Sequence, residues 1–340
     1  MRVLIVKTSS LGDLVHCFPA LSDAARAIPG IRFDWVAEQA FAGLPSLHPA
    51  VERVIPIGLR RWRKNWRRAW RKGEIQRFWR DLRRDEYDCV IDAQGLLLKS
   101  AWVARAAHGP SAGYDRHSAR DRWVGGMYHG AHAIARDQHA IVRNRQLFAA
   151  VLGYALDAAE PDFGLRVEAR HVDKPYLVFL HATTWPSKHY PDLYWAELTH
   201  YAAQAGLPAA MPWHGPMERV RIESIRDRGG KPVLPARMEL SELAAFLAGA
   251  RAVIGVDSGL THLAAALGRP TLGLYGPTAP GLSGVVGQRA RNLRADFPCA
   301  PCMRRDCDYR GEAERHPACF TTLPPGEVWE AMRALVNADA

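Results

Sequence analysis

The sequence of 340 residues lacks the features of a secreted or membrane-spanning protein. It has no apolar run near the roughly 20 residues that a transmembrane helix needs. The N-terminal MRVLIVKTSSLGD starts with a short apolar run that polar residues and glycine interrupt, unlike a signal peptide. We therefore expect a cytoplasmic protein.

Glycine-rich nucleotide fingerprints are missing as well. No GxGxxG follows the first predicted strand, and GxxxxGK[ST] does not occur. These absences disfavour a nicotinamide enzyme and a P-loop enzyme. The chain also has no internal repeat of solenoid period and no low-complexity tract, which excludes solenoid architectures.

Two rounds of alternating strands and helices are present instead. Short apolar runs predict strands at 1–7, 33–36, 53–56 and 89–92, and again at 176–180, 207–211, 252–256 and 271–275. Helical patterns lie at 18–28, 74–84, 194–205, 240–249, 260–267 and 327–336. This alternation is typical of an α/β fold with a doubly wound parallel sheet in each half.

The length of the chain suits two domains. Residues 155–174 lack a clear apolar period and mark the boundary. We assign residues 1–160 to an N-terminal Rossmann-like domain and residues 174–322 to a C-terminal Rossmann-like domain. Residues 323–340 form a last helix, for which packing back on the N-terminal domain is one arrangement to test.

Positive charge is concentrated in one segment. The net charge is +10, and residues 60–84 hold twelve Arg or Lys against two acids, so the rest of the chain is balanced. Such a segment predicts an anionic partner. Trp62, Trp66 and Trp70 are spaced four apart, which predicts one face of a basic amphipathic helix suited to anionic lipid. The alternative is a solvated helix whose tryptophans pack on the domain.

Four of the six cysteines crowd into 299–319. A cytoplasmic protein keeps them reduced, so we do not expect disulfides. Their spacing fits no standard zinc template, which leaves a metal site and free thiols both open. We predict neither a metal nor a required cofactor. The residues concerned are Cys299, Cys302, Cys307 and Cys319.

The segment 9–13 follows the first predicted strand, where loops commonly line a ligand cleft. Gly12 allows backbone to approach a ligand, and Asp13 is a candidate general base. Asp is also a common helix cap, and this alternative explains Asp13 equally well.

Two further candidates follow strands of the second half. Asp257 and Ser258 open a helix, where free N–H groups and the helix dipole suit a diphosphate, and His262 lies on its first turn. The segment 181–184 and Lys188 offer hydroxyls and a cation for phosphate oxygens. The alternatives are simple caps, a packed histidine and a solvated lysine.

Four stretches, taken in order, resemble the lipopolysaccharide heptosyltransferases. HATT followed by Lys-His, and the early RRWRK, resemble the type I members in particular. The resemblance runs from residue 1 to about 290 and does not extend to the cysteine-rich segment. The stretches are MRVLIVKTSSLGDLVHCFPAL, VIDAQGLLLKSA, HATTWPSKHYP and VDSGLTHLAAALGRPTLGLYGPTAPG.

The resemblance implies a GT-B fold, in which two Rossmann-like domains face each other across a cleft. By the resemblance, the domain of residues 1–160 binds the acceptor and the domain of residues 174–322 binds the nucleotide sugar. It implies an inverting transferase that moves L-glycero-D-manno-heptose from ADP-heptose, a substrate, to the inner Kdo of Kdo2-lipid A. The expected partners are therefore ADP-heptose, Kdo2-lipid A and an anionic inner-membrane surface, with the enzyme attached peripherally to its cytoplasmic face. We expect a monomer that does not bind nucleic acid.

By the same resemblance, Asp13 is the proposed base and Lys188 lies near the diphosphate and the transferred sugar. The implied donor residues are Thr183, Thr184, Ser258, Gly259 and Leu260 for the phosphates, Asp257 for the heptose, and Glu218 and Met238 for the nucleoside. The implied acceptor residues are Arg60, Arg61, Arg63, Lys64 and Arg120. We add His262 to the donor set and Ser10 and Gly12 to the acceptor set.

Other functions remain open. Heptosyltransferase II and a sugar-nucleotide epimerase share the fold, although an epimerase has no use for the basic segment. A nucleic-acid-binding protein uses that segment but leaves Asp13, Lys188 and Asp257 without a task; it predicts steeply salt-dependent binding to DNA or RNA.

Overall fold

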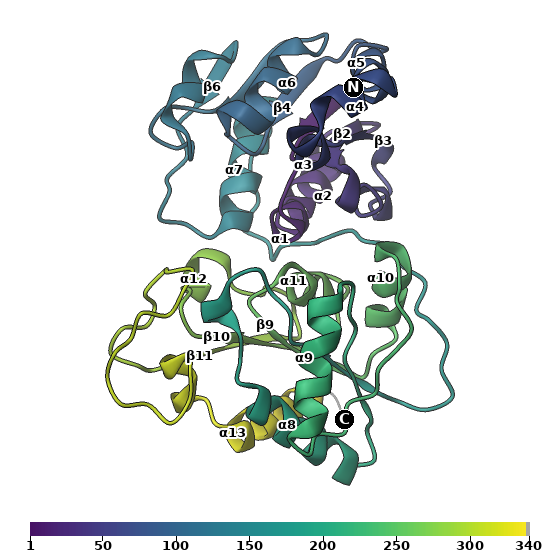
Figure 1. Cartoon of the computed structure of the whole chain (residues 1–340). Coiled ribbons are helices and arrows are strands. Elements are labelled where there is room, and N and C mark those ends of the chain that lie inside the picture. Colours follow the sequence, from purple (N-terminus) through teal and green to yellow (C-terminus); the bar gives the residue numbers. More distant parts are fainter. Residues whose placement is uncertain (338–340) are drawn as a thin grey trace. The chain divides into compact units, whose positions relative to one another are not determined.

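The computed structural model describes residues 1–337, which form two compact units (Figure 1). The first comprises Met1–Arg166, and the second begins at Val167. The division falls inside 155–174, the segment that lacks an apolar period. Each unit is described by itself.

The N-terminal unit is built on a six-stranded parallel sheet of order β3-β2-β1-β4-β5-β6. In the central strand β1, residues 3–6 are apolar and buried, as in strands covered on both faces. The strands are β1 (Arg2–Val6), β2 (Arg32–Glu38), β3 (Val51–Ile57), β4 (Cys89–Asp92), β5 (Ser111–Tyr114) and β6 (Gly130–His132).

The helices of this unit connect the strands, and α2 packs beside α7. Their bounds are α1 (Leu11–Val15), α2 (Phe18–Ala27), α3 (Leu59–Lys64), α4 (Trp66–Arg71), α5 (Glu74–Leu82), α6 (Trp102–Ala106) and α7 (Ala140–Leu152). Short turns of other helix types are η1 (Gln39–Phe41), η2 (Pro45–Leu47), η3 (Leu97–Ala101) and η4 (Arg122–Gly126).

The C-terminal unit holds a five-stranded parallel sheet of order β11-β10-β9-β7-β8. Its strands are β7 (Leu177–Leu180), β8 (Ala209–Ala210), β9 (Ala252–Val256), β10 (Thr271–Tyr275) and β11 (Ala290–Arg294). Its helices are α8 (Asp192–Gln204), α9 (Pro216–Asp227), α10 (Leu240–Ala248), α11 (Gly259–Ala266), α12 (Pro280–Ser283) and α13 (Pro325–Asn337), with the turns η5 (Pro186–Lys188) and η6 (Ala318–Thr322). All the strands and helices predicted for this half are present.

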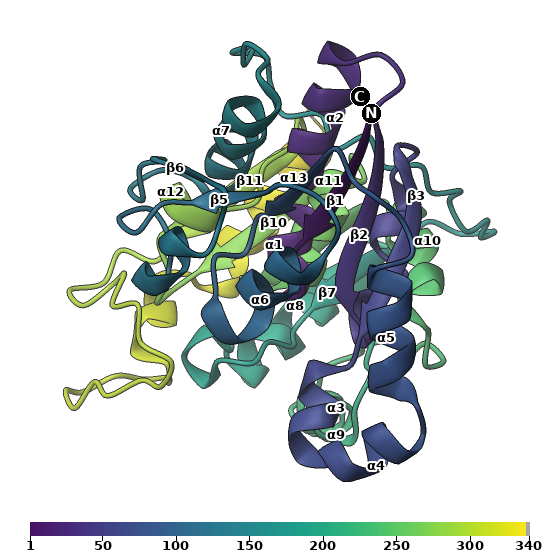
Figure 2. The same cartoon turned by 90° about the horizontal axis from the view of Figure 1, so that it is seen from above.

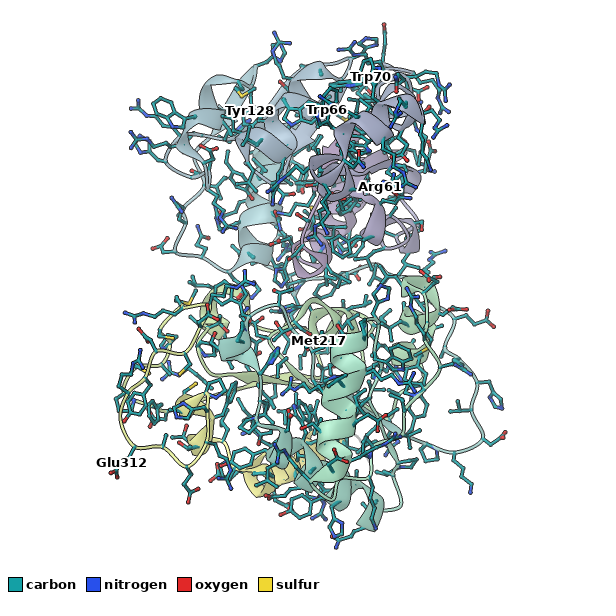
Figure 3. The ribbon with its side chains drawn as sticks, in the orientation of Figure 1. Arg61, Trp66, Trp70, Tyr128, Met217 and Glu312 are labelled. Carbon is teal, nitrogen blue, oxygen red and sulfur yellow. The ribbon has the colours of Figure 1, made fainter. Side chains whose placement is uncertain are left out.

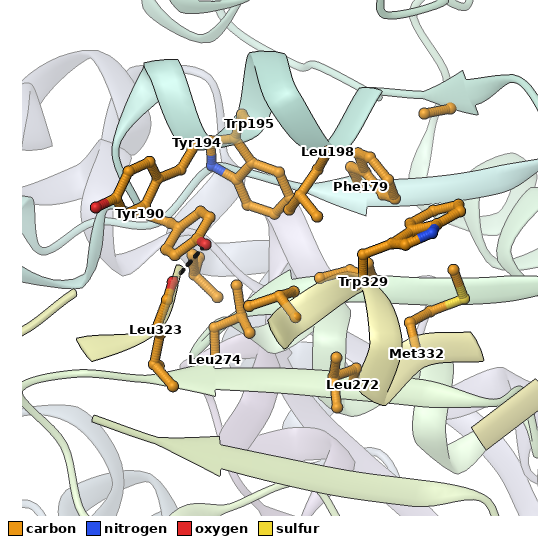
Figure 4. Close-up of a cluster of buried hydrophobic side chains, with 14 of the residues drawn as sticks. Phe179, Tyr190, Tyr194, Trp195, Leu198, Leu272, Leu274, Leu323, Trp329 and Met332 are labelled. Carbon is orange, nitrogen blue, oxygen red and sulfur yellow. Dashed lines mark hydrogen bonds between the residues drawn. The ribbon is translucent and has the colours of Figure 1, made fainter. Parts of the chain in front are cut away.

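The last helix, α13, packs on the C-terminal unit. It lies beside α8 and against β9 and β10, and Trp329 and Met332 are buried there (Figure 4). In the same cluster the hydroxyl of Tyr190 donates to the carbonyl of Leu323 at 2.7 Å. The apolar face of this helix therefore belongs to the second core. Its suggested packing on the N-terminal domain stays a prediction.

Parallel pairing brings the carboxyl ends of all strands in a unit to one edge of its sheet. In the N-terminal unit that edge carries the segments after β1, β3 and β4. In the C-terminal unit it carries the segments after β7 and β9. The fold therefore gathers each unit's predicted site residues along one edge. None of the helices among residues 1–337 has both the length and the apolar content to cross a bilayer.

Candidate active site

A buried ionic cluster centres on Asp257, directly after β9. Lys188 Nζ lies 2.7 Å from Asp257 Oδ2, and the Thr278 hydroxyl donates to the same oxygen at 2.7 Å. His262 Nε2 is 3.5 Å from Oδ1. Burial by itself raises the pKa of Asp257, but His262 and Lys188 outweigh it and hold that pKa well below its usual range. Asp257 is therefore a carboxylate at neutral pH.

The N-terminus of α11 begins beside this carboxylate. Ser258 is its N-cap, in extended conformation, and its carbonyl accepts the N–H of Thr261 at 3.1 Å. Gly259 and Leu260 follow and are partly exposed. The first N–H groups of a helix have no partner inside it and favour anions. The strand–helix junction predicted from the sequence is thus confirmed.

The segment 181–190 after β7 supplies the lysine and the two threonines. The Thr183 hydroxyl donates to the carbonyl of Asp257 at 3.3 Å, and His189 Nε2 donates to the carbonyl of Thr183 at 3.0 Å. Thr184 is exposed. Lys188 Nζ also lies 4.6 Å from the centre of the Trp185 ring, a cation–π contact. The structure therefore brings Thr183, Lys188 and Asp257 together.

Arg221 of α9 ties both ends of this segment, a role that the sequence analysis missed. Its guanidinium donates to the carbonyls of His181 and Tyr190, each at 2.5 Å, and to Asp192 Oδ1 at 2.7 Å. Burial lowers the pKa of Arg221. The partners lie 29 to 40 residues away along the chain, so no local motif could have indicated them.

A pocket of about 1000 Å³ opens beside the same segment. Thr183, Glu218 and Arg221 line it, together with Met217, whose exposed side chain is labelled in Figure 3. Glu218 accepts the N–H of His214 at 2.7 Å. Met238, the other residue predicted near the nucleoside, is buried and is not among the lining residues.

In the N-terminal unit, Asp13 belongs to a capping box at the start of α1. Ser10 is the N-cap, and its N–H and hydroxyl donate to Asp13 Oδ2 at 2.6 and 2.9 Å. The cap interpretation is therefore confirmed, with Ser10 rather than Asp13 as the N-cap. Both bonds end on Oδ2, so Oδ1 lies outside the capping box. Gly12, which precedes Asp13 in α1, is buried.

The basic segment is not one helix, which corrects the prediction. The chain breaks at Asn65 (φ −155°, ψ 72°), whose side chain accepts the N–H of Arg68 and caps α4. Trp62 is buried against Phe78, whereas Trp66 and Trp70 are 61% and 55% exposed. Figure 2 shows α3, α4 and α5 together at one end of β2 and β3. The three tryptophans therefore do not share one face.

The predicted acceptor-side cations are all exposed. Arg61 pairs with Glu74 at 2.7 Å, and the Arg60 guanidinium lies 5.3 Å from the centre of the Phe41 ring. Arg61, Trp66 and Trp70 can be followed in Figure 3. The remaining members of this set are Arg63, Lys64 and Arg120.

The four clustered cysteines are free thiols. Cys299 and Cys307 are exposed, Cys302 is half-buried, and burial raises the pKa of Cys319 to about 12. Within residues 1–337, no group of three or more His, Cys, Asp or Glu side chains is arranged to hold a metal ion.

Known proteins resemble this chain over nearly its full length. Residues 75–312 match glycosyltransferase family 9 (heptosyltransferase). Lipopolysaccharide heptosyltransferase 1 of Pseudomonas aeruginosa is 48% identical and covers 99% of each chain. The same-named protein of Escherichia coli K12 is 46% identical over 87% of this chain and 94% of its own.

Solved structures agree. Escherichia coli heptosyltransferase WaaC with ADP has a TM-score of 0.84 and 41% identity, covering 98% of this chain and 100% of its own. The parallel sheets and this match define a glycosyltransferase of the GT-B fold. With the sequence matches, the chain belongs to glycosyltransferase family 9, the heptosyltransferases.

Proposed function

We propose that the chain transfers L-glycero-D-manno-heptose from ADP-heptose to the inner Kdo of Kdo2-lipid A, with inversion. The observation that carries the proposal is the Lys188–Asp257 pair beside the N-terminus of α11. It occurs in a chain 46 to 48% identical to the type I heptosyltransferases of Pseudomonas aeruginosa and Escherichia coli. The type I protein of Campylobacter coli and the type II relatives are 22 to 24% identical.

The donor diphosphate is stabilised by Lys188 and by the first N–H groups of α11. As the bond between heptose and phosphate breaks, negative charge grows on the departing ADP. A cation and preorganised N–H donors lower the energy of that charge without a metal ion. Thr183, Thr184 and Ser258 offer hydroxyls to the phosphates. Glu218, which lines the pocket, serves the nucleoside side. A role there for the buried Met238 stays a prediction.

Asp257 holds the transferred sugar. It stays ionised because Lys188 and His262 lower its pKa, so it accepts hydrogen bonds from heptose hydroxyls. The ion pair with Asp257 also restricts the rotation of the Lys188 side chain and holds its ammonium group beside the donor site. The pair is therefore preorganised before the donor arrives.

Asp13 acts as general base toward the attacking Kdo hydroxyl. The capping box ties Oδ2 to Ser10 and so fixes the direction of Oδ1, which takes the proton. The hydroxyl oxygen bonds to the anomeric carbon as the phosphate oxygen leaves, and this single displacement inverts that centre. Capping and catalysis are thus compatible uses of one carboxylate.

The exposed cations of α3 and α4, together with Arg120 in the segment after β5, bind the anionic acceptor and an anionic membrane surface. Kdo carries a carboxylate and lipid A carries phosphates, which match Arg60, Arg61, Arg63, Lys64 and Arg120 in charge. The exposed rings of Trp66 and Trp70 suit the headgroup layer of a bilayer. The enzyme is therefore peripheral on the cytoplasmic face of the inner membrane.

The test is ADP release from ADP-heptose with and without Kdo2-lipid A, repeated in EDTA. We expect release that depends on the acceptor, persists in EDTA and gives an inverted heptosyl product by NMR. A matched reaction with a heptosylated Kdo2-lipid A, the type II acceptor, is the control. The assignment would be rejected if the protein used the heptosylated acceptor but not Kdo2-lipid A, or if it used another nucleotide sugar in place of ADP-heptose.

A further inference from the structure

Gln94 follows β4 in the VIDAQG stretch, and the proposed function leaves it without a task. Its Oε1 accepts the N–H groups of Thr8 and Ser9 at 2.7 and 3.1 Å, and its Nε2 donates to the carbonyl of Ser9 at 2.5 Å. One side chain thus holds the main chain of Ser9 on both sides. The contact joins segments 85 residues apart.

Gln94 is itself held by a buried acid. Asp92 Oδ1 accepts the N–H groups of Gln94 and Gly95 at 2.8 and 3.0 Å, and the hydroxyl of Tyr128 donates to Oδ2 at 2.6 Å. Asp92 is fully buried. Gly95 has φ +65°, a conformation that suits glycine. The side chain of Gln94 therefore starts from a fixed backbone.

The held segment leads directly to Asp13. Ser9 precedes Ser10, and the N–H and hydroxyl of Ser10 donate to Asp13 Oδ2. A continuous series of hydrogen bonds thus runs from Tyr128 through Asp92 and Gln94 to the segment that orients Asp13. A primary amide accepts main-chain N–H groups through its oxygen and donates to a carbonyl through its nitrogen, whereas a carboxylate of similar shape only accepts.

We propose that Gln94 is a positioning residue for proton transfer by Asp13. The inference rests on the proposed role of Asp13. A misplaced base costs rate even when all groups are present. Gln94 therefore acts on the turnover step and not on donor binding, whose residues lie in the C-terminal unit.

The first experiment compares Gln94→Met, matched in length, with the wild type. We expect kcat to fall about 10- to 100-fold, with the KM for ADP-heptose and the affinity for ADP unchanged. Gln146→Met is the control, because the amide of Gln146 donates to Gln138 Oε1 at 2.9 Å, far in sequence from the Asp13 segment. An unchanged kcat in folded Gln94→Met would overturn the inference.

The second experiment asks whether Gln94 acts through Asp13. In an Asp13→Asn background, Gln94→Met should slow the residual reaction far less than it slows the wild type, since coupled residues are not additive. Equal factors in both backgrounds would contradict the proposal. Tyr128→Phe, a milder change at the other end of the series, should lower kcat in the same sense; if Gln94→Met does not fold, this variant takes its place in the cycle.

If the wild type shows no acceptor-dependent release, the proposed function fails and this inference with it. An active wild type with an insensitive Gln94→Met overturns this inference alone.

Discussion

At the scale of single residues, the C-terminal site depends on opposite charges buried together. Asp257 and Lys188 each satisfy the other, and His262 and Thr278 complete the surroundings of the carboxylate. Removing one charge leaves the other buried and unpaired, which is strongly unfavourable. The pair is therefore both a binding device and a source of stability.

Asp257→Asn should weaken donor binding and change the pH dependence of stability. The folded pKa of Asp257 lies below its unfolded value of about 4. Its ionised form therefore contributes stability that is present above pH 4 and lost as pH falls through the folded pKa. Urea unfolding at pH 7 and pH 3 should show a smaller acid loss for the variant. Equal losses would contradict this account of the cluster.

Arg221→Lys should raise the KM for ADP-heptose about tenfold while the KM for the acceptor stays the same. A lysine has no planar fork, so it cannot reach two carbonyls and Asp192 together. The segment that carries Lys188 then loses its fixed ends. Arg226→Lys is the control on the same helix, since Arg226 is exposed and pairs with Glu223. Equal kinetics for the two variants would contradict the role of Arg221.

At the scale of elements, the basic segment 60–84 lies in three short helices, α3, α4 and α5, and its tryptophans differ in burial. The ring of Trp62 packs against the ring of Phe78, and its indole N–H donates to Glu74 Oε2 at 3.2 Å. Trp66 and Trp70 remain exposed beside Arg67, Arg68 and Arg71. The alternative in which the tryptophans pack on the domain therefore holds for Trp62. Contact of Trp66 and Trp70 with anionic lipid stays a prediction.

Replacing Trp66 and Trp70 with Ser should weaken binding to anionic vesicles at least as much as it weakens binding to neutral ones. The rings supply apolar contact, and the neighbouring cations supply charge attraction. Co-sedimentation with anionic phosphatidylglycerol vesicles measures binding by charge attraction and apolar contact together. Co-sedimentation with neutral phosphatidylcholine vesicles measures binding by apolar contact. Trp123→Ser, another exposed ring, is the matched control. Unchanged vesicle binding in the double variant would reject membrane contact by α4.

Sequence patterns predicted most strands, because those strands are short, apolar and bounded by turns, but they did not predict the long helices α7 and α9. The strands β5, β6 and β11 were missed, since SAGY, GAH and ARNLR lack the β-branched apolar runs of the others. The break at Asn65 was missed because spacing alone cannot show that Asn65 caps α4. Gln94 and Arg221 were missed as site residues because tertiary contacts, far apart in sequence, define their roles.

At the scale of the whole molecule, the chain forms two α/β units, and each is built on its own parallel sheet. The C-terminal core includes α13, so the end of the chain stabilises the donor-binding unit. Phe320 and Val328 are fully buried in the same cluster. Truncation before α13 therefore exposes the apolar face of the second sheet.

Met332→Ala should destabilise the C-terminal unit by about 2 to 5 kcal/mol, the usual cost of removing a large buried side chain. Arg333→Ala is the control, since the side chain of Arg333 follows Met332 in sequence but is exposed and pairs with Glu330. Differential scanning calorimetry with and without ADP measures the effect. If α13 were dispensable, both variants would melt like the wild type.

The most direct test of the account compares ADP release by the wild type and Asp13→Asn, with ADP-heptose and Kdo2-lipid A. The variant keeps the size of the side chain and an oxygen for the Ser10 cap, but it loses the base. We predict that kcat falls about 100-fold or more, while ADP affinity and melting temperature stay near wild type. A folded Asp13→Asn protein with an unchanged rate would contradict the proposed mechanism.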